Sequence, residues 1–238
     1  MLAAETKAVG GSHAAPAPDS TRSWAQIVEP VEPFLESVAQ RLSEQVQSFD
    51  PQIAPYAQYA LTNQGKQLRP ALVCLSGGAA GRVNDNLVTV AVIIEMVHLA
   101  TLVHDDVVDE AEIRRCRPTL AANWGNEISV LLGDCLFANA LKLAASFPTP
   151  EVCRAVSGAT HTVCAGEILQ TLRRGDFQFS RADYFKILEM KTAALFALSC
   201  DLGASLAGGS AEQRSALRQF GLMLGTAYQI FDDCVDLF

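Results

Sequence analysis

The sequence predicts an all-α domain of long helices, and three observations lead to this prediction. From Trp24 onward, apolar residues recur at three- and four-residue spacing, and no segment shows the alternation expected of a strand. Half of the 238 residues (50%) are hydrophobic, enough to bury a sizeable core. Two apolar helices end in acidic clusters, "LVHDDVVDE" at 102–110 and "YQIFDDCVDLF" at 228–238.

The expected helices follow one another with turn-forming residues between them. In chain order they are residues 24–48, 50–61, 68–81, 84–109, 119–147, 150–172, 181–207 and 211–238. The clearest breaks are Asn63-Gln64-Gly65, Gly77-Gly78, Phe147-Pro148, Arg174-Gly175 and Gly208-Gly209. The last helix should begin with a capping box, in which Ser210 is the cap and Gln213 the third helical residue.

Composition narrows the range of functions. The Ala/Gly/Pro/Ser-rich start predicts a disordered tail at 1–23, before one helical domain at 24–238. The tail has no apolar core and carries Glu5 and Asp19, so it resembles neither a secretory signal nor a transit peptide. The net charge of −8 disfavours binding to nucleic acid.

Cellular location is also predicted from composition. The seven dispersed cysteines include no CxxC pair, which indicates reduced thiols in the cytoplasm and no zinc site. Leu87–Val103 is apolar enough to suggest a membrane span, but it carries Glu95 and His98, which are costly at the centre of a bilayer. We therefore expect a buried core helix in a cytoplasmic protein with no transmembrane segment.

The acidic clusters predict a metal site. Residues four apart in a helix share one face, so Asp105 should lie beside Asp109, and Asp232 beside Asp236. Carboxylates at the end of an apolar helix repel one another unless a cation joins them, and their hard oxygen atoms favour Mg²⁺. A single cluster could be a solvated helix end. Two clusters that both follow apolar helices favour the metal.

Basic residues near these clusters predict an anionic ligand. Two short basic segments stand out in an acidic chain, "GKQLRP" at 65–70 and "EIRRCRP" at 112–118. Lys191 lies on the apolar face of its expected helix, where a lysine either extends to the solvent or binds an anion inside the bundle. Surface ion pairs could explain each segment alone. Together they predict an anion held partly through metal and partly by Arg and Lys.

Together these segments resemble the polyprenyl synthetase family, the trans-isoprenyl diphosphate synthases, from about Trp24 to the last residue. The matching motifs are "GKQLRP" (65–70), "EMVHLATLVHDDVVDEAEIRRCRPT" (95–119), "NWGNEISVLLGDCLFANAL" (123–141), "GEILQ" (166–170), "KTAALF" (191–196) and "GTAYQIFDDCVDLF" (225–238). The resemblance implies an isoprenoid-synthase-type helical bundle around a deep cavity, usually a homodimer. It also implies Mg²⁺-assisted, head-to-tail condensation of isopentenyl diphosphate with an allylic diphosphate.

The resemblance also implies roles for individual residues. The residues implied to be catalytic are Asp105, Asp109, Lys191 and Asp232. Mg²⁺ would be held by Asp105, Asp109 and Asp232, with Asp106, Asp233 and Asp236 as weaker ligands or supports. Isopentenyl diphosphate would be bound by Lys66, Arg69, His98 and Arg115. The allylic diphosphate would be contacted by Arg114, Lys191, Thr192 and Gln229.

Some details bear on the product and on departures from the family. Ala100 and Thr101 lie one turn before Asp105, and small residues there leave room for a long-chain product. Gln67 stands where the family usually has a basic residue, and Cys116 stands where it usually has glycine.

The end of the chain leaves alternatives open. The last helix has no C-terminal signal, and members of the family continue with further helices, so we expect the chain to be C-terminally incomplete. It could be a fragment of an active enzyme, or a non-catalytic or partner subunit. A class I terpene cyclase is a weaker alternative, because a cyclase has no use for a second diphosphate site.

Overall fold

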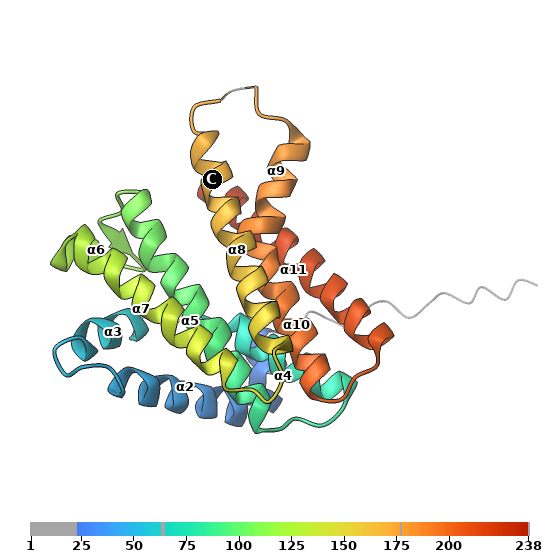
Figure 1. Cartoon of the computed structure of the whole chain (residues 1–238). Helices are drawn as coiled ribbons and strands as arrows, with labels where there is room; N and C mark the ends of the chain where they lie inside the picture. Colours follow the sequence, from blue (N-terminus) through green and yellow to red (C-terminus); the bar gives the residue numbers. More distant parts are fainter. Residues whose placement is uncertain (1–22, 63–64, 177, 238) are drawn as a thin grey trace, which may run out of the picture. The chain divides into compact units, whose positions relative to one another are not determined.

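The computed structural model describes residues 23–62, 65–176 and 178–237, without the side chains of 24, 25, 236 and 237, and these residues are mostly helical (Figure 1). Contacts divide the chain after Pro30, and each part is considered separately. The N-terminal part contains α1 (Trp24–Val28) and most of η1, a 3₁₀ turn (Glu29–Val31). The predicted disordered tail falls almost wholly outside the described residues.

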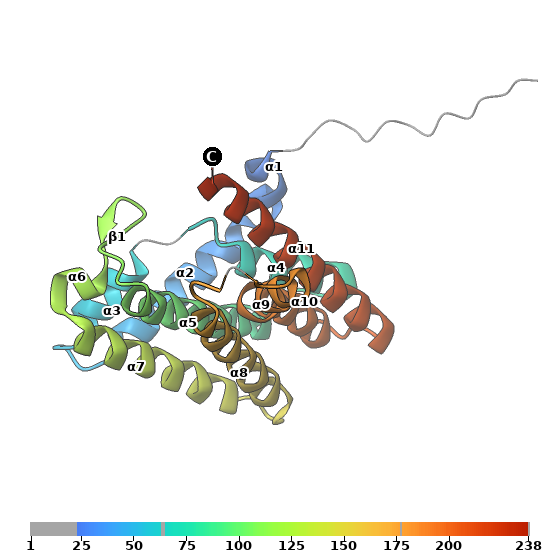
Figure 2. The same ribbon diagram turned by 90° about the horizontal axis from the view of Figure 1, so that it is seen from above.

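The larger part is a bundle of helices, which confirms the predicted all-α fold. Its elements are α2 (Glu32–Gln47), α3 (Ala54–Leu61), α4 (Leu68–Ala80), α5 (Asp85–Val108), α6 (Leu120–Trp124), α7 (Asn126–Ala145), α8 (Glu151–Leu172), α9 (Arg181–Leu188), the π-helical turn η2 (Glu189–Ala193), α10 (Ala194–Leu206) and α11 (Ala211–Leu237). Figure 2 shows α5 between α2 and α8. The long elements match the predicted helices closely, because their hydrophobic period is clear.

Helix α5 is the core of the bundle. It packs against α2, α4, α7 and α10, and its residues Val90, Ile93 and Ile94 are fully buried. A helix that is apolar on all sides must be enclosed. Within the described residues, α5 and α7 are long and apolar enough to cross a membrane. Burial within the protein covers 61% of the apolar window of α5, and enclosed core helices commonly meet this criterion.

The segment between α5 and α6 differs from the prediction, because it forms a short hairpin. Strands β1 (Ile113–Arg114) and β2 (Arg117–Pro118) pair antiparallel, joined by Arg115 and Cys116. Both linking residues have positive φ, 51° and 61°, as tight hairpins with two-residue turns require. Glycine adopts this conformation without strain, so Cys116 costs some stability here.

Two other expected helices are interrupted, and one predicted break is wrong. Gly125, with φ 88°, separates α6 from α7, and η2 separates α9 from α10. Helix α4 continues through Gly77 and Gly78. A Cβ atom on Gly77 would lie 2.2 Å from Leu87 Cδ2, so this glycine is needed for close packing against α5.

Helix α11 begins with the predicted capping box. The Ser210 backbone N–H donates to Gln213 Oε1 at 2.8 Å, and the Gln213 N–H donates to Ser210 Oγ at 3.3 Å. Two glycines then bring α11 against α10 and η2. A Cβ atom would lie 2.6 Å from Ala193 Cα at Gly225, and 2.6 Å from the Phe196 carbonyl oxygen at Gly221.

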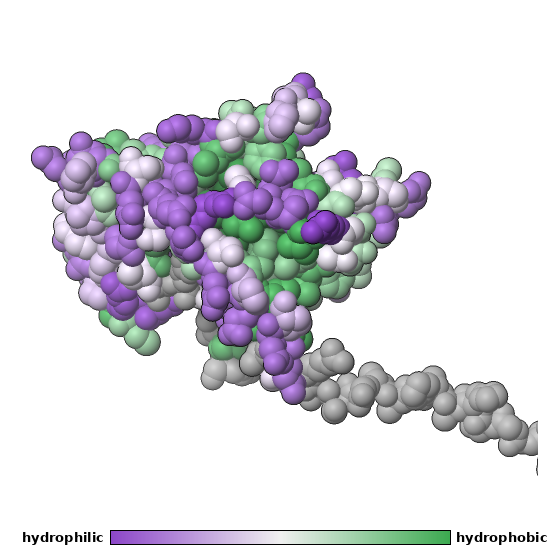
Figure 3. Space-filling model, turned by 90° about the horizontal axis from the view of Figure 1, so that it is seen from below, coloured by the Kyte–Doolittle hydropathy of each residue, from purple (hydrophilic) through white to green (hydrophobic). Residues whose placement is uncertain are grey.

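Another face of α11 is apolar and exposed. Phe220, Met223 and Phe231 are 51%, 64% and 68% exposed. Seen from below, the molecule shows apolar residues gathered beside a band of hydrophilic residues (Figure 3). The buried face of α11 is therefore set by small residues, whereas many of its large apolar side chains remain on the surface.

The close approach of α11 gives a stability prediction. Gly225→Ala should lower the free energy of unfolding by roughly 1–3 kcal/mol, because the new methyl group meets the backbone of Ala193. Gly158→Ala on α8 is the control: no atom of the described residues lies within 4 Å of its Cβ position, and alanine favours the helix by up to about 1 kcal/mol. Urea unfolding measures both. Equal or greater stability of the Gly225 variant would contradict the packing argument.

Candidate functional site

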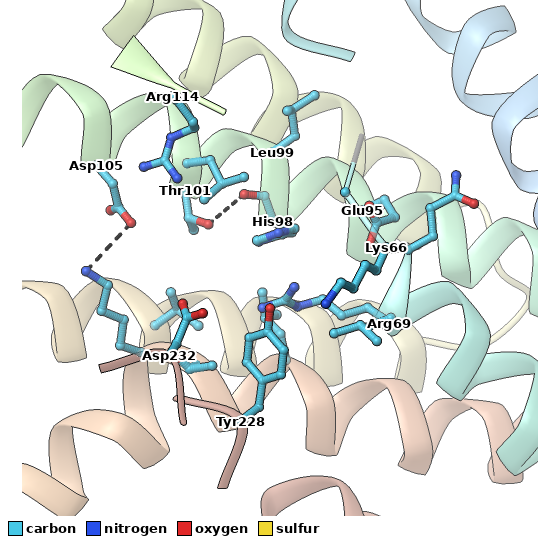
Figure 4. A pocket seen from close by; sticks show the side chains of 18 of the residues that line it. Lys66, Arg69, Glu95, His98, Leu99, Thr101, Asp105, Arg114, Tyr228 and Asp232 are labelled. Carbon is cyan, nitrogen blue, oxygen red and sulfur yellow. Dashed lines mark hydrogen bonds and ion pairs between the residues drawn. The ribbon is translucent and has the colours of Figure 1, made fainter. Parts of the chain in front are cut away.

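One cavity of about 600 Å³ opens between α4, α5, the β1–β2 hairpin, η2, α10 and α11 (Figure 4). The structure brings all the predicted catalytic, substrate-binding and metal-binding residues to it. They are Lys66, Arg69, His98, Asp105, Asp109, Arg114, Arg115, Lys191, Thr192, Gln229 and Asp232. Their convergence is a structural fact, and their individual roles stay predictions.

The C-terminal end of α5 supplies the first acidic cluster. This end carries the negative pole of the helix dipole, and its last turn has no basic residue. Asp105 and Asp109 line the cavity, while Asp106 is 5% exposed and accepts a 2.7 Å hydrogen bond from Arg114 Nε. Asp106 is therefore engaged by the hairpin, in keeping with a supporting position.

Lys191 pairs with Asp105 and also with Glu167, a residue that the sequence analysis did not single out. Lys191 Nζ lies 3.7 Å from Asp105 Oδ2 (Figure 4) and 2.7 Å from Glu167 Oε2. Burial raises the pKa of Asp105 to about 6; Lys191 opposes this shift, while Glu167 and Asp109 add to it. The Lys191 ammonium group thus lies between two carboxylates and only partly neutralises the charge of each.

The π-helical turn η2 positions Lys191. Helix α8 meets this turn at Gly166, where a Cβ atom would lie 2.8 Å from the backbone N of Lys191 and 2.8 Å from Met190 Cβ. The glycine of "GEILQ" therefore allows the approach, and the neighbouring Glu167 binds the lysine. π-turns occur frequently at functional sites, and this one also directs Thr192 to the cavity.

In the second acidic cluster, Asp232 and Asp233 have different surroundings. Asp232 lies on the opposite side of the cavity from Asp105 (Figure 4). Asp233 instead accepts hydrogen bonds from the Tyr184 hydroxyl at 2.5 Å and from Gln229 Nε2 at 2.8 Å. Burial, then this bond to Asp233, raises the pKa of Tyr184 to about 12, so its hydroxyl stays a donor. The Asp236 side chain lies outside the described residues.

Gln229 connects α11 to η2. Its Oε1 accepts a 2.8 Å hydrogen bond from Thr192 Oγ1, while its amide nitrogen donates to Asp233. The orientation of the amide is therefore fixed at both ends. Since Asp233 also binds Tyr184 of α9, one connected set of hydrogen bonds holds the acidic end of α11 beside the cavity.

A buried cationic region lines another part of the cavity. The Arg69 guanidinium lies 4.8 Å from the centre of the Phe196 ring, and its Nε is buried with no hydrogen-bond partner among the described residues. Burial lowers the pKa of Arg69, and nearby Glu95 partly reverses this. Burial and the surrounding arginines hold the pKa of His98 well below its usual value, so its imidazole is neutral.

The entrance to this region lies between the segment before α4 and the hairpin. A Cβ atom on Gly65 would lie 2.7 Å from Arg115 Nη2, so the arginine packs directly over this glycine. Lys66 is exposed, and Gln67 has a φ of 48°. The basic residues of "GKQLRP" and "EIRRCRP", far apart in sequence, therefore meet here.

The sequence reasoning missed several participants. Glu95 and Tyr228 line the cavity, Glu167 binds Lys191, and Arg174 contacts Asp109. Glu95 could have been found as an acid in the middle of an otherwise apolar helix, one turn before His98. Tyr228 stands four residues before Asp232 and so shares its face. Nothing in the local sequence indicated the partners of Glu167 and Arg174.

The donor set fits Mg²⁺ held together with a phosphate ligand. Among the described residues, no group of three His, Cys, Asp or Glu side chains converges as a closed metal site requires. Mg²⁺ commonly uses one or two carboxylates and completes its octahedron with waters and phosphate oxygens. Asp105 on the last turn of α5, Asp109 directly after this helix, and Asp232 across the cavity provide carboxylates of this kind.

Comparisons with known proteins point to one family. A polyprenyl synthetase family model matches residues 50–238. The octaprenyl diphosphate synthase of Haemophilus influenzae is 35% identical over 211 residues, which are 89% of this chain and 64% of the relative. Component 2 of the heptaprenyl diphosphate synthase of Bacillus subtilis is 36% identical over 202 residues, 85% of this chain and 58% of the relative. This chain thus spans less than two thirds of these curated relatives.

Solved structures agree with the sequence comparison. The polyprenyl synthase of Caulobacter crescentus CB15, complexed with calcium and isoprenyl diphosphate, superposes with a TM-score of 0.87 at 36% identity. The match covers 92% of this chain and 67% of that one. The decaprenyl diphosphate synthase of Rhodobacter capsulatus gives a TM-score of 0.86 at 32% identity, covering 90% and 66%. The matched family is the one that the motifs resemble.

Asp105 gives a prediction on pH and stability. Its pKa is higher in the folded than in the unfolded chain, so ionisation of Asp105 removes stability as the pH rises from about 4 to about 6. In metal-free buffer at pH 7.5, Asp105→Asn should raise the free energy of unfolding by on the order of 1–3 kcal/mol. The gain should disappear near pH 4. A loss of stability at pH 7.5 would show that the contact with Lys191 outweighs burial.

Proposed function

This chain belongs to the polyprenyl synthetase family, and we propose that it forms the prenyl-transfer site of a trans-polyprenyl diphosphate synthase. The reaction condenses isopentenyl diphosphate head to tail with an allylic diphosphate and releases diphosphate. The observation that carries the proposal is a single cavity with two acidic helix ends and a separate buried cationic region. Such a cavity suits two diphosphate substrates at once.

The allylic diphosphate would bind at the acidic end of the cavity. Asp105 and Asp109 at the end of α5 and Asp232 on α11 would hold Mg²⁺ there, and bound Mg²⁺ would stabilise the charge of the leaving diphosphate. The solved relative with calcium and isoprenyl diphosphate supports the use of a divalent cation. Lys191 and Arg114 supply fixed positive charge at the same end.

Isopentenyl diphosphate would bind at the cationic end. Arg69 is enclosed, and its Nε has no hydrogen-bond partner among the described residues, so an anion can satisfy this donor. His98 is neutral and can donate one hydrogen bond without adding charge. Lys66 and Arg115 lie at the entrance, where they can attract and orient the diphosphate.

Apolar side chains between these ends would protect the reaction from water. Leu99, Leu102, Val163 and Leu195 line the cavity, and ionisation of the allylic substrate leaves a carbocation that water would destroy. No side-chain nucleophile is needed, because the isopentenyl double bond attacks the cation. The departing diphosphate can accept the final proton.

Product length is proposed to be long. Relatives named as octaprenyl and heptaprenyl synthases support this. Of the two small residues before Asp105, Thr101 is the proposed control of product length, because Thr101 lines the cavity whereas Ala100 is fully buried and does not.

A homodimer is proposed from the family resemblance, and a cytoplasmic location is proposed from the dispersed cysteines without a CxxC pair. A second candidate function is a subunit that acts with another chain, which is favoured by the relative named as component 2 of a heptaprenyl synthase.

Turnover tests the proposed reaction. With Mg²⁺, radiolabelled isopentenyl diphosphate and an allylic diphosphate, the protein should form a longer prenyl diphosphate, resolved by chromatography. Asp105→Ala should lower kcat by on the order of a hundredfold or more, because charge stabilisation of the leaving group is lost. Arg154→Gln, on the exposed surface of α8, is the control.

The alternatives predict other outcomes of the same experiment. A cyclase would consume the allylic diphosphate without isopentenyl diphosphate. A partner subunit would show no turnover alone but would alter the product of a full-length relative mixed with it. The proposed reaction would be refuted if the protein formed no longer prenyl diphosphate from the two substrates together.

Thr101 gives a prediction on chain length. Thr101→Phe should shorten the main product, because a phenyl ring at this position blocks the path of a growing hydrocarbon chain. Thr101→Ser is the matched control and should leave the product unchanged. Ala100→Phe is less suitable, since a large side chain at a fully buried position overpacks the core. An unchanged product distribution for Thr101→Phe would contradict this assignment.

A further inference from the structure

The outermost carboxylate of the first cluster is held by an arginine outside the predicted site. Arg174 follows the C-terminal end of α8, and its Nη2 forms an ion pair with Asp109 Oδ1. Its Nη1 also donates to the Val108 carbonyl oxygen at 3.2 Å. One guanidinium thus binds both the Asp109 carboxylate and a carbonyl at the end of α5, where the helix dipole is negative.

The arrangement completes a pattern along the end of α5. Each aspartate forms an ion pair with a basic residue: Asp105 with Lys191, Asp106 with Arg114, and Asp109 with Arg174. These three cations come from three separate segments of the chain. Without bound metal, the protein therefore supplies its own positive charge to each carboxylate.

Arg174 differs from the other two cations in its accessibility. Its side chain is 48% exposed, against 23% for Lys191 and 36% for Arg114. It lies at the rim of the cluster and can leave Asp109 without opening the core. Lys191, by contrast, is also held by Glu167.

We propose that Arg174 is the counter-ion of Asp109 in the metal-free site and competes with the divalent cation for this carboxylate. This inference rests on the proposed function, in which Asp109 is a metal ligand. A carboxylate paired with a guanidinium has to give up that pair before its oxygens can bind a metal ion. Arg174 therefore weakens the binding of metal alone.

The neighbouring arginine is a matched control. Arg173 is equally exposed, at 48%, and carries the same charge one residue away. Its Nη1 binds Asp176 Oδ2 at 3.2 Å, within its own turn. A general effect of removing positive charge near the site should appear in Arg173→Gln and Arg174→Gln alike, whereas loss of the specific pair should appear only in Arg174→Gln.

The experiment measures binding of Mn²⁺ alone, in place of Mg²⁺, to the full chain by electron paramagnetic resonance of the free ion. Arg174→Gln should bind Mn²⁺ about two- to fivefold more tightly than the unmodified protein, the range expected for a half-exposed arginine–carboxylate pair. Arg173→Gln should bind as the unmodified protein does. In an Asp109→Asn background, Arg174→Gln should have no effect, and circular dichroism verifies that each variant is folded.

Several results would overturn the inference. They are unchanged or weaker Mn²⁺ binding by Arg174→Gln, an equal gain in Arg173→Gln, or a gain that persists in the Asp109→Asn background. Weaker binding of inorganic diphosphate with unchanged Mn²⁺ binding would make Arg174 a diphosphate ligand instead. Because no turnover is involved, a protein without prenyl-transfer activity could still show the predicted gain, so failure of the inference and failure of the proposed function are distinguishable.

Discussion

The site depends on repulsion among carboxylates at the negative end of a buried helix. Asp105, Asp106 and Asp109 are crowded onto the last turns of α5, where neither the helix dipole nor the apolar surroundings favour their charge. Cations from the hairpin, from η2 and from the turn after α8 offset this cost. The requirement for compensating charge therefore explains why three segments distant in sequence meet at one helix end.

The charges and polar groups of the cavity are only partly compensated by the protein itself, and this supports the proposed function. Asp105 keeps a raised pKa despite Lys191, and in the part of the chain that the structure describes the buried Nε of Arg69 has no hydrogen-bond partner despite Glu95 nearby. An arrangement selected for stability alone would pair these groups fully or replace them with apolar residues. The excess of negative charge at one end of the cavity and of positive charge at the other suits a metal-bound diphosphate and a free diphosphate.

Local rules predicted much of this structure. The hydrophobic period gave the long helices, the capping box gave the start of α11, and four-residue spacing placed Asp105 beside Asp109. The hairpin was missed because two-residue strands are too short to show alternation, and η2 because a π-turn keeps the helical pattern. The partners of Lys191 and Asp109 depend on packing between distant segments, so only the fold could identify them. The choice between Ala100 and Thr101 required the orientation of α5 in the bundle.

The same helix also fixes how far apart the two ends of the cavity lie. His98 and Asp105 are seven residues apart on α5, which is two turns and about 10 Å along the axis. Because α5 packs against α2, α4, α7 and α10 on the faces that do not line the cavity, it cannot slide or rotate without disturbing the core. Prenyl transfer between two bound diphosphates requires their hydrocarbon parts to meet at a set distance. The apolar composition that makes α5 resemble a membrane span also buries it in the bundle, and this burial makes α5 a rigid spacer between the two proposed substrate sites.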